Sequence, residues 1–184
     1  MTLLDSIIEQ NRTFVRPGAF PPLPKNPQKQ FAIFTCMDTR LVDFLEPAMG
    51  IRRGDAKVIK NAGNTVIDQN GGVIRSLVTA VFLLGVEEVF VIGHRDCGMS
   101  QVDPVDLRSR MIARGIAPAA IDALEPGLAQ WLGAFACPEK NVEDVVRLIR
   151  TSPLIPHDVP IHGLLFCPND GHLEVIVRGY PPEE

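Results

Sequence analysis

Three short clusters rich in cysteine, glycine and polar residues each follow an apolar run. They are Cys-Met-Asp-Thr-Arg (36–40), Asn-Ala-Gly-Asn (61–64) and Gly-His-Arg-Asp-Cys-Gly (93–98). His94 and Cys97 are three residues apart, which lets both side chains point at one atom where a strand turns into a helix. With Cys36 they supply two thiolates and one imidazole, leaving one tetrahedral position open, as in catalytic zinc sites. Sulfur and imidazole favour zinc over magnesium or calcium, so we interpret these three residues as ligands of one zinc ion per subunit.

Asp38 and Arg40 are the candidate catalytic residues beside this site. If the chain stays extended after Cys36, all three side chains share one face, because extended side chains repeat every two residues. Arg40 can then hold Asp38 in a bidentate ion pair and keep the carboxylate off the metal, which frees a position for water. Zinc lowers the pKa of its water from about 15.7 toward about 7, and two thiolates make that shift smaller. Asp38 is expected to orient the resulting hydroxide.

The elements that must position these clusters alternate between strands and helices. Strands are predicted at 31–36, 56–60, 88–93, 161–166 and 173–178, the last two forming a hairpin around Asn169-Asp170-Gly171. Helices are predicted at 41–49, 71–84 and 142–150, with two further pieces between 103 and about 135, broken by Gly115 and Pro118. This order indicates an α/β fold with a mainly parallel sheet of four to five strands flanked by helices. Ligands of such sheets collect at the carboxyl ends of the strands, where all three clusters fall.

The N-terminal residues predict a helical arm. Residues 2–14 predict a helix, because their apolar residues recur at helical spacing. Thr2 can cap this helix, with Asp5 three residues later. Residues 15–30 contain five prolines, which favours an extended connection. We expect the helix to lie against a second subunit, with docking on its own domain as the alternative. The chain thus divides into an arm (1–30) and a zinc-binding catalytic part (31–184), one domain overall.

Composition limits the possible functions. The chain has 184 residues and a formal net charge of −4, with no run of lysine or arginine, so nucleic acid is not an expected partner. The first residues lack the basic leader of a signal peptide. The longest apolar run, near 77–86, is too short to cross a bilayer, so no membrane association is expected. We interpret the chain as soluble and cytoplasmic, where its four cysteines favour metal binding over disulfides.

Taken together, Cys-x-Asp-x-Arg, Asn-Ala-Gly and His-x-x-Cys-Gly resemble the β-class carbonic anhydrases, in the short form found in bacteria and archaea. The likeness covers about residues 2–180. It implies zinc on Cys36, His94 and Cys97, an Asp38–Arg40 dyad, and reversible hydration of carbon dioxide to bicarbonate and a proton by attack of zinc-bound hydroxide. It also implies a homodimer or a dimer of dimers in which the first helix reaches across to the partner. The single tryptophan, Trp131, lies too late for the tryptophan, arginine and tyrosine set of the bicarbonate-regulated members, so that regulation is not expected.

Substrate-pocket residues are less well defined. Gly63, Asn64 and Gly98 are candidates, because a glycine lets backbone approach a pocket. Gly63 and Asn64 are equally well explained as turn formers. Arg95 and Asp96, between two of the expected ligands, are interpreted as solvent-facing or as outer contacts of the site.

Several alternatives remain at this stage. Cys36 near Arg40 resembles a cysteine nucleophile, and Cys97 at a helix start resembles a reactive thiol. Asp38 and Arg40 can form a plain surface ion pair. At the level of function, the alternatives are hydrolysis of carbon disulfide or carbonyl sulfide at the same zinc site, a zinc-binding scaffold without activity, and a nucleotide-binding domain. The last lacks both G-x-G-x-x-G and a Walker sequence.

Overall fold

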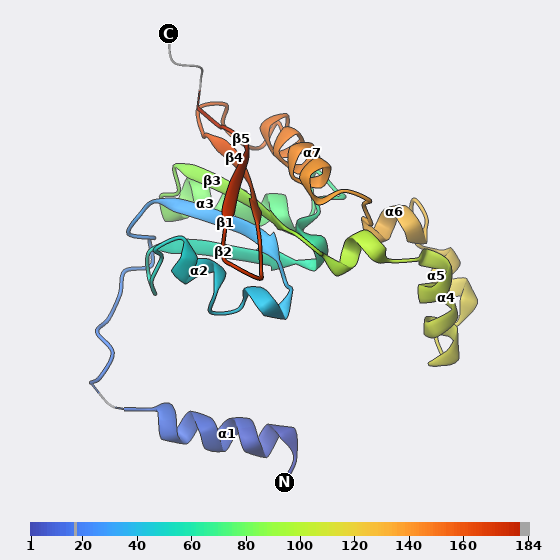
Figure 1. Cartoon of the computed structure of the whole chain (residues 1–184), viewed down its shortest axis with the longest axis horizontal. Coiled ribbons are helices and arrows are strands. Elements are labelled where there is room, and N and C mark those ends of the chain that lie inside the picture. The colour runs from blue at the N-terminus through green and yellow to red at the C-terminus, as the bar shows by residue number, and fades with distance from the viewer. Residues whose placement is uncertain (17, 181–184) are drawn as a thin grey trace.

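Five strands form one sheet in a computed structural model that describes residues 1–16 and 18–180 (Figure 1). Their order is β2-β1-β3-β4-β5. The strands are β1 (Phe31–Cys36), β2 (Ala56–Asn61), β3 (Glu88–His94), β4 (Ile161–Phe166) and β5 (Leu173–Val177). The first four are parallel, and β5 pairs antiparallel with β4. The expected mainly parallel α/β sheet with its hairpin at one edge is therefore confirmed.

The register of the parallel strands brings the three polar clusters to one edge. Cys36 at the end of β1 pairs with Asn61 at the end of β2. On the other side of β1, Thr35 pairs with Ile92, two residues before His94. Because parallel strands end at the same side of a sheet, the segments that follow β1, β2 and β3 leave the sheet close together.

Apolar side chains cover both faces of the sheet, as expected for parallel strands with helices on both sides. One face packs against α3 (Gly72–Leu84) and α7 (Pro138–Arg150). The other face packs against the segment between β1 and β2, which holds a short 3₁₀ helix (Thr39–Leu41) and α2 (Leu45–Ala48). Side chains of β1 alternate between the two cores, Ala32 and Phe34 facing one and Ile33 the other.

Helix α7 lies unusually close to the strands that carry the site. A Cβ atom on Gly93 of β3 would lie 2.6 Å from Cγ2 of Val142, and one on Gly163 of β4 would lie 2.7 Å from its Cγ1. Both positions therefore require glycine for α7 to pack at this distance. The helix also begins four residues earlier than expected, because Pro138 occupies its first turn, where no backbone N–H is needed.

Two helical predictions need correction. The expected helix at 41–49 is reduced to α2, because Asp43 adopts a left-handed φ of 54° and interrupts it. The region 103–135 holds three pieces rather than two: α4 (Pro104–Ala113), α5 (Pro118–Asp122) and α6 (Leu128–Leu132). The additional break falls at Pro126 and Gly127, and Gly127 has a φ of 120° that a helix does not allow. These pieces extend away from the sheet (Figure 1).

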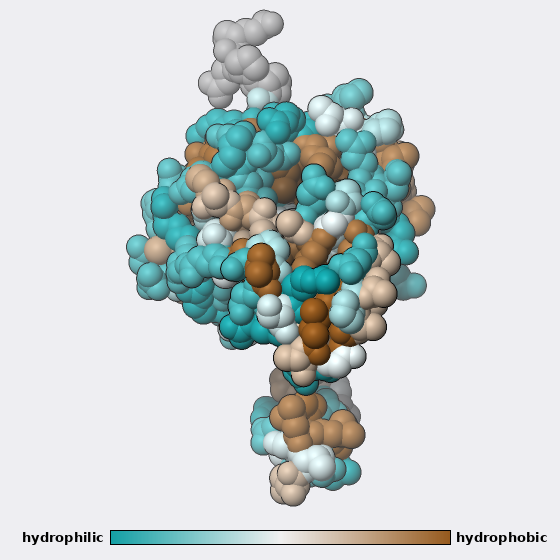
Figure 2. Space-filling view, turned by 90° about the vertical axis from the view of Figure 1, so that its right-hand side faces the viewer, coloured by the Kyte–Doolittle hydropathy of each residue, from teal (hydrophilic) through white to brown (hydrophobic). Residues whose placement is uncertain are grey.

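Helix α1 (Leu3–Phe14) confirms the expected helix and its capping box at Thr2. None of its residues is buried, and Leu3, Leu4, Ile7 and Ile8 are between 44% and 78% exposed. It stands apart from the sheet of its own chain (Figures 1 and 2), so the alternative of docking on its own domain is wrong for this chain. Pro17 of the arm and residues 181–184 lie outside the described residues. Within the described ranges, no helix has the length and apolar character to cross a membrane.

Candidate metal centre

Cys36, His94 and Cys97 meet at the carboxyl edge of the sheet. Their sulfur atoms and one ring nitrogen all lie within 4.8 Å of one another, and all three residues are buried. Cys36 ends β1, His94 ends β3, and Cys97 follows on the turn after β3. The structure therefore brings together the three side chains that the sequence motif selected.

The imidazole of His94 is held with one nitrogen facing the two thiols. Its Nδ1 lies 2.9 Å from the carbonyl oxygen of Arg95, so Nδ1 donates and Nε2 keeps its lone pair in the neutral ring. Arg95 is itself fixed, because its N–H donates to the carbonyl of Phe166 on β4. Nε2 is buried and has no hydrogen-bond partner among the described residues. A buried nitrogen acceptor without a partner costs free energy unless another group binds it.

The donor set fits a zinc ion. The two sulfurs are 4.0 Å apart. Two sulfurs bound to one tetrahedral zinc at about 2.3 Å would be about 3.8 Å apart. The Nδ1 bond to a backbone carbonyl is also the usual way in which a metal-binding histidine is oriented. An ion here would satisfy the unpartnered Nε2 of His94.

The two thiols differ in how readily they lose a proton. The hydrogen bond between the sulfurs lowers the pKa of Cys36 and raises the pKa of Cys97, so only one of them is readily ionised. The backbone N–H of Gly63 also donates to the Cys36 sulfur at 3.3 Å, which favours the thiolate there. A cation between the sulfurs would favour ionisation of both.

Asp38 and Arg40 pair beside this group, but not in the way the sequence suggested. The chain does not stay extended, because Asp38 caps the 3₁₀ helix and accepts the backbone N–H of Arg40 at 2.8 Å. The guanidinium still binds the carboxylate in a bidentate manner, with Nε 3.1 Å from Oδ1 and Nη2 2.9 Å from Oδ2. Chiefly through the hydrogen bond from Arg40, the pKa of Asp38 is lowered to about 2. The same ion pair raises the pKa of Arg40.

Asp96 is an outer contact of this site, one of the two roles that the sequence left open for it, but its partner Arg40 was not predicted. Its carboxylate and its backbone carbonyl both accept hydrogen bonds from Arg40, at 2.8 and 2.7 Å. The only sequence signal is its place between His94 and Cys97, together with the tendency of aspartate to adopt left-handed φ in turns; its φ is 53°.

Gly63 contacts one of the three candidate ligands directly, through its backbone N–H to the Cys36 sulfur. It has a left-handed φ of 69°, and a Cβ atom there would lie 2.9 Å from Met99 and Phe135 side-chain atoms. Its carbonyl accepts a hydrogen bond from Asn141 of α7, a buried residue that the sequence did not single out. The left-handed φ of Gly63 agrees with a turn role, and the contact that its backbone makes here is to the Cys36 sulfur.

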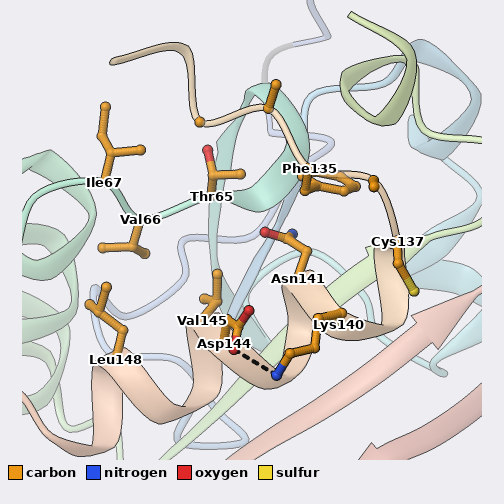
Figure 3. Close-up of a pocket in the computed structure, with 13 residues that line it drawn as sticks. Thr65, Val66, Ile67, Phe135, Cys137, Lys140, Asn141, Asp144, Val145 and Leu148 are labelled. Atoms are coloured by element: carbon orange, nitrogen blue, oxygen red, sulfur yellow. Dashed lines mark hydrogen bonds and ion pairs between the residues drawn. The ribbon is translucent and has the colours of Figure 1, made fainter. Parts of the chain in front are cut away.

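The other pocket candidates differ in burial. Asn64 is fully buried, and its Nδ2 has no partner among the described residues. Gly98 is exposed, with open space where a Cβ atom would be. Asn141 also extends into a cavity between α7 and residues 65–67 (Figure 3), which Cys36, His94 and Cys97 do not line. A pocket role for Gly63, Asn64 and Gly98 stays a prediction.

The remaining cysteines and histidines stay apart from the metal group. Cys137 is exposed and donates to Glu139, and Cys167 is a free thiol after β4. His162 is buried, where it contacts Glu88 at 2.9 Å and accepts the N–H of Gly179. Within residues 1–16 and 18–180, Cys36, His94 and Cys97 form the single group with the geometry to hold a metal ion.

The fold and this site define an α/β protein with a buried Cys-His-Cys group suited to a metal ion and an ion-paired aspartate beside it. A family model described as carbonic anhydrase matches residues 31–173. The chain belongs to this family, and the resemblance of its motifs to the β class is confirmed.

Relatives and solved structures agree over nearly the whole chain. The Bacillus subtilis protein YtiB is 42% identical over 185 residues, covering 98% of this chain and 99% of YtiB. The crystal structure of β-carbonic anhydrase isoform I from Trichomonas vaginalis is 40% identical and superposes with a TM-score of 0.93, covering 98% of this chain and all of that one. A carbon disulfide hydrolase from Acidithiobacillus thiooxidans is 33% identical, covering 82% of this chain and 78% of its own.

Proposed function

We propose that this chain is a zinc-dependent enzyme that hydrates carbon dioxide reversibly to bicarbonate and a proton, with Cys36, His94 and Cys97 holding one zinc ion per subunit. The observation that carries the proposal is the buried Nε2 of His94, which accepts no hydrogen bond from residues 1–16 or 18–180 and faces two thiols 4.0 Å apart. Membership in the carbonic anhydrase family supports it. The alternatives of a nucleophilic or reactive cysteine fit less well, since they use one thiol and leave the second buried thiol beside it without a role.

When bound, zinc would lower the pKa of a water molecule, to about 7 in the carbonic anhydrases that use three histidines. The residues of this chain then have distinct tasks. Asp38, whose pKa of about 2 keeps it ionised, accepts a hydrogen bond from the attacking oxygen and orients it. Arg40 binds both oxygens of Asp38 and holds the carboxylate away from the ligand atoms. His94 presents Nε2 because Arg95 fixes its Nδ1 proton.

Two measurements made on the same sample test this proposal. Zinc content per chain and carbon dioxide hydration are measured together, on the parent and on Cys36→Ser. We expect about one zinc per chain and rapid hydration in the parent, and loss of both in the variant. Zinc at full content without hydration over a range of pH would favour the scaffold alternative instead.

Hydrolysis of carbon disulfide is the second candidate function. The similarity to the hydrolase from Acidithiobacillus thiooxidans favours it. The site also has apolar neighbours suited to either linear substrate, since Met99 and Phe135 pack in the same cluster as Cys36 and Cys97. Offering carbon dioxide, carbonyl sulfide and carbon disulfide to one zinc-loaded preparation decides between them by their kcat/KM values.

We further propose that the chain works as a homodimer, or a dimer of dimers, in the reducing cytoplasm. An amphipathic helix with an exposed apolar face needs a surface to cover that face. Val58 on the edge strand β2 and Leu83 on α3 add exposed apolar surface. The four cysteines are all free thiols, which favours a reducing compartment.

A further inference from the structure

The guanidinium group of Arg40 lies between two carboxylates. On one side it donates to both oxygens of Asp38, from Nε at 3.1 Å and from Nη2 at 2.9 Å. On the other side Nη1 donates to Oδ2 of Asp96 at 2.8 Å and Nη2 donates to its backbone carbonyl at 2.7 Å. Four hydrogen bonds thus fix the plane of the guanidinium.

The contacts of Arg40 with Asp96 are better anchored than those with Asp38. Asp96 lies in the turn between His94 and Cys97, so its backbone is held by the two residues proposed to bind the metal. Gln101 donates to the other carboxylate oxygen of Asp96 at 3.3 Å. The Arg40 side chain is 39% exposed, and an exposed ion pair with Asp38 alone would restrain both side chains only weakly. The contacts to Asp96 supply the missing restraint.

We infer that Asp96 is a positioning residue, which holds Arg40 and through it sets the position of the Asp38 carboxylate. This inference rests on the proposed function, because it assigns Asp96 a role only through Asp38. In this arrangement Arg40 connects the end of β1 to the end of β3. Loss of the Asp96 carboxylate releases Arg40 on one side, and Asp38 becomes free to move toward His94 Nε2, 3.7 Å from its Oδ2.

Asp96→Gly is the appropriate variant, because glycine adopts the left-handed φ of 53° without strain and keeps the backbone carbonyl. We expect zinc content and melting temperature as in the parent, and kcat/KM lowered by about 10- to 100-fold. Asp96→Asn keeps one oxygen acceptor for Arg40 and should recover part of the activity. Asp106→Asn, which removes a surface contact to Arg110, is the matched control and should behave as the parent.

A double-mutant cycle separates positioning through Arg40 from a general structural role. If Asp96 acts through Arg40, then Asp96→Gly has no further effect on kcat/KM in an Arg40→Ala background. The same additional loss in both backgrounds would overturn the inference.

The visible spectrum of cobalt(II)-substituted protein gives a readout independent of turnover. We expect the spectrum of Asp96→Gly to differ from that of the parent. Adding Asp96→Gly to Asp38→Ala should cause no further change, because the difference requires the Asp38 carboxylate. Parent-like kcat/KM and spectrum in Asp96→Gly, with Asp38→Ala inactive, would overturn the inference alone. Parent-like activity in Asp38→Ala would overturn the proposed mechanism as well.

Discussion

Oδ2 of Asp38 lies 3.7 Å from Nε2 of His94, while the hydrogen bonds that the carboxylate accepts within the described part of the chain all come from Arg40. The carboxylate is therefore next to the ligand atoms but is held by a different partner. A catalytic carboxylate in this place would act on a metal-bound molecule without being a ligand itself.

The three proposed ligands should be required for metal binding. Replacing Cys36 with serine removes a thiolate that is fixed at 4.0 Å from Cys97, so zinc affinity should fall by about 100-fold or more. Zinc per chain after dialysis against a weak chelator measures this, and hydration should be lost in parallel. Cys137→Ser alters an exposed thiol outside the group and should keep both. Full zinc occupancy in Cys36→Ser would contradict the assignment.

Asp38 should be needed for turnover but not for the metal. We expect Asp38→Ala to keep one zinc per chain and to lose about 100-fold or more in kcat, because the attacking oxygen is no longer oriented. Stopped-flow hydration assays with metal analysis on the same sample check both parts. A variant that loses zinc would instead identify Asp38 as a ligand.

The ionised state of Asp38 should also stabilise the fold in a defined pH range. Its pKa is about 2 in the folded chain and 3.8 in an ordinary environment. Since the folded value is the lower one, the stabilisation is complete above about pH 4 and is lost as the pH falls through about 2. For the metal-free protein we expect this to amount to about 1–2 kcal/mol in the free energy of unfolding.

Denaturant unfolding at a series of pH values between 2 and 5 measures the stabilisation that comes from ionised Asp38. Asp38→Asn should be less stable than the parent at pH 5, and this difference should vanish toward pH 2. An equal difference at all pH values would show that the ionised carboxylate is not its source.

Gly63 should not tolerate a side chain. Alanine there would combine a left-handed φ of 69° with contacts of 2.9 Å to Met99 and Phe135. We expect Gly63→Ala to lower the free energy of unfolding by about 2–4 kcal/mol and to weaken metal binding, because the N–H that contacts Cys36 shifts. Gly72→Ala is the control, since nothing lies within 4 Å of its added carbon, and thermal unfolding compares the two.

The apolar face of α1 should be required for self-association. Leu4→Glu with Ile8→Glu places two charges on exposed apolar positions of that face. Sedimentation velocity should show the parent as a dimer or larger and the double variant as a smaller species. Thr13→Glu adds charge on the opposite side of the helix and should leave the association state unchanged. A parent that sediments as a monomer would refute the proposed dimer.

Much of the fold was predictable, because the relevant signals are local. The strands of the sheet are short apolar runs bounded by turn residues, and α3 ends at Gly85, in the left-handed conformation that favours glycine. The segment from 103 to 135 was harder to predict. Its helices are short and bury little surface, so their apolar residues do not recur at a clear helical spacing. Asp43, with its left-handed φ, has no sequence signature distinct from that of an ordinary helical aspartate.

The site shows the same contrast. We could predict that three donors meet, because His94 and Cys97 are three residues apart and Cys36 ends a neighbouring strand at the same edge of the sheet. The pairing of Asp38 with Arg40 was expected from an extended backbone, yet it forms in a 3₁₀ turn. The contacts of Asp96 and Asn141 depend on how separate segments pack, which spacing along one segment does not encode.

The order β2-β1-β3 has a consequence for how the protein is made. β1 leaves the ribosome before either of its hydrogen-bonding neighbours, β2 some twenty residues later and β3 some fifty. A run of five buried residues therefore has two open edges until β2 emerges and one until β3 emerges, the kind of segment that aggregates or recruits chaperones during synthesis. Cys36 sits at the tip of that strand, so the nascent chain has no complete set of donors to capture an ion until His94 and Cys97 have emerged and β3 has paired.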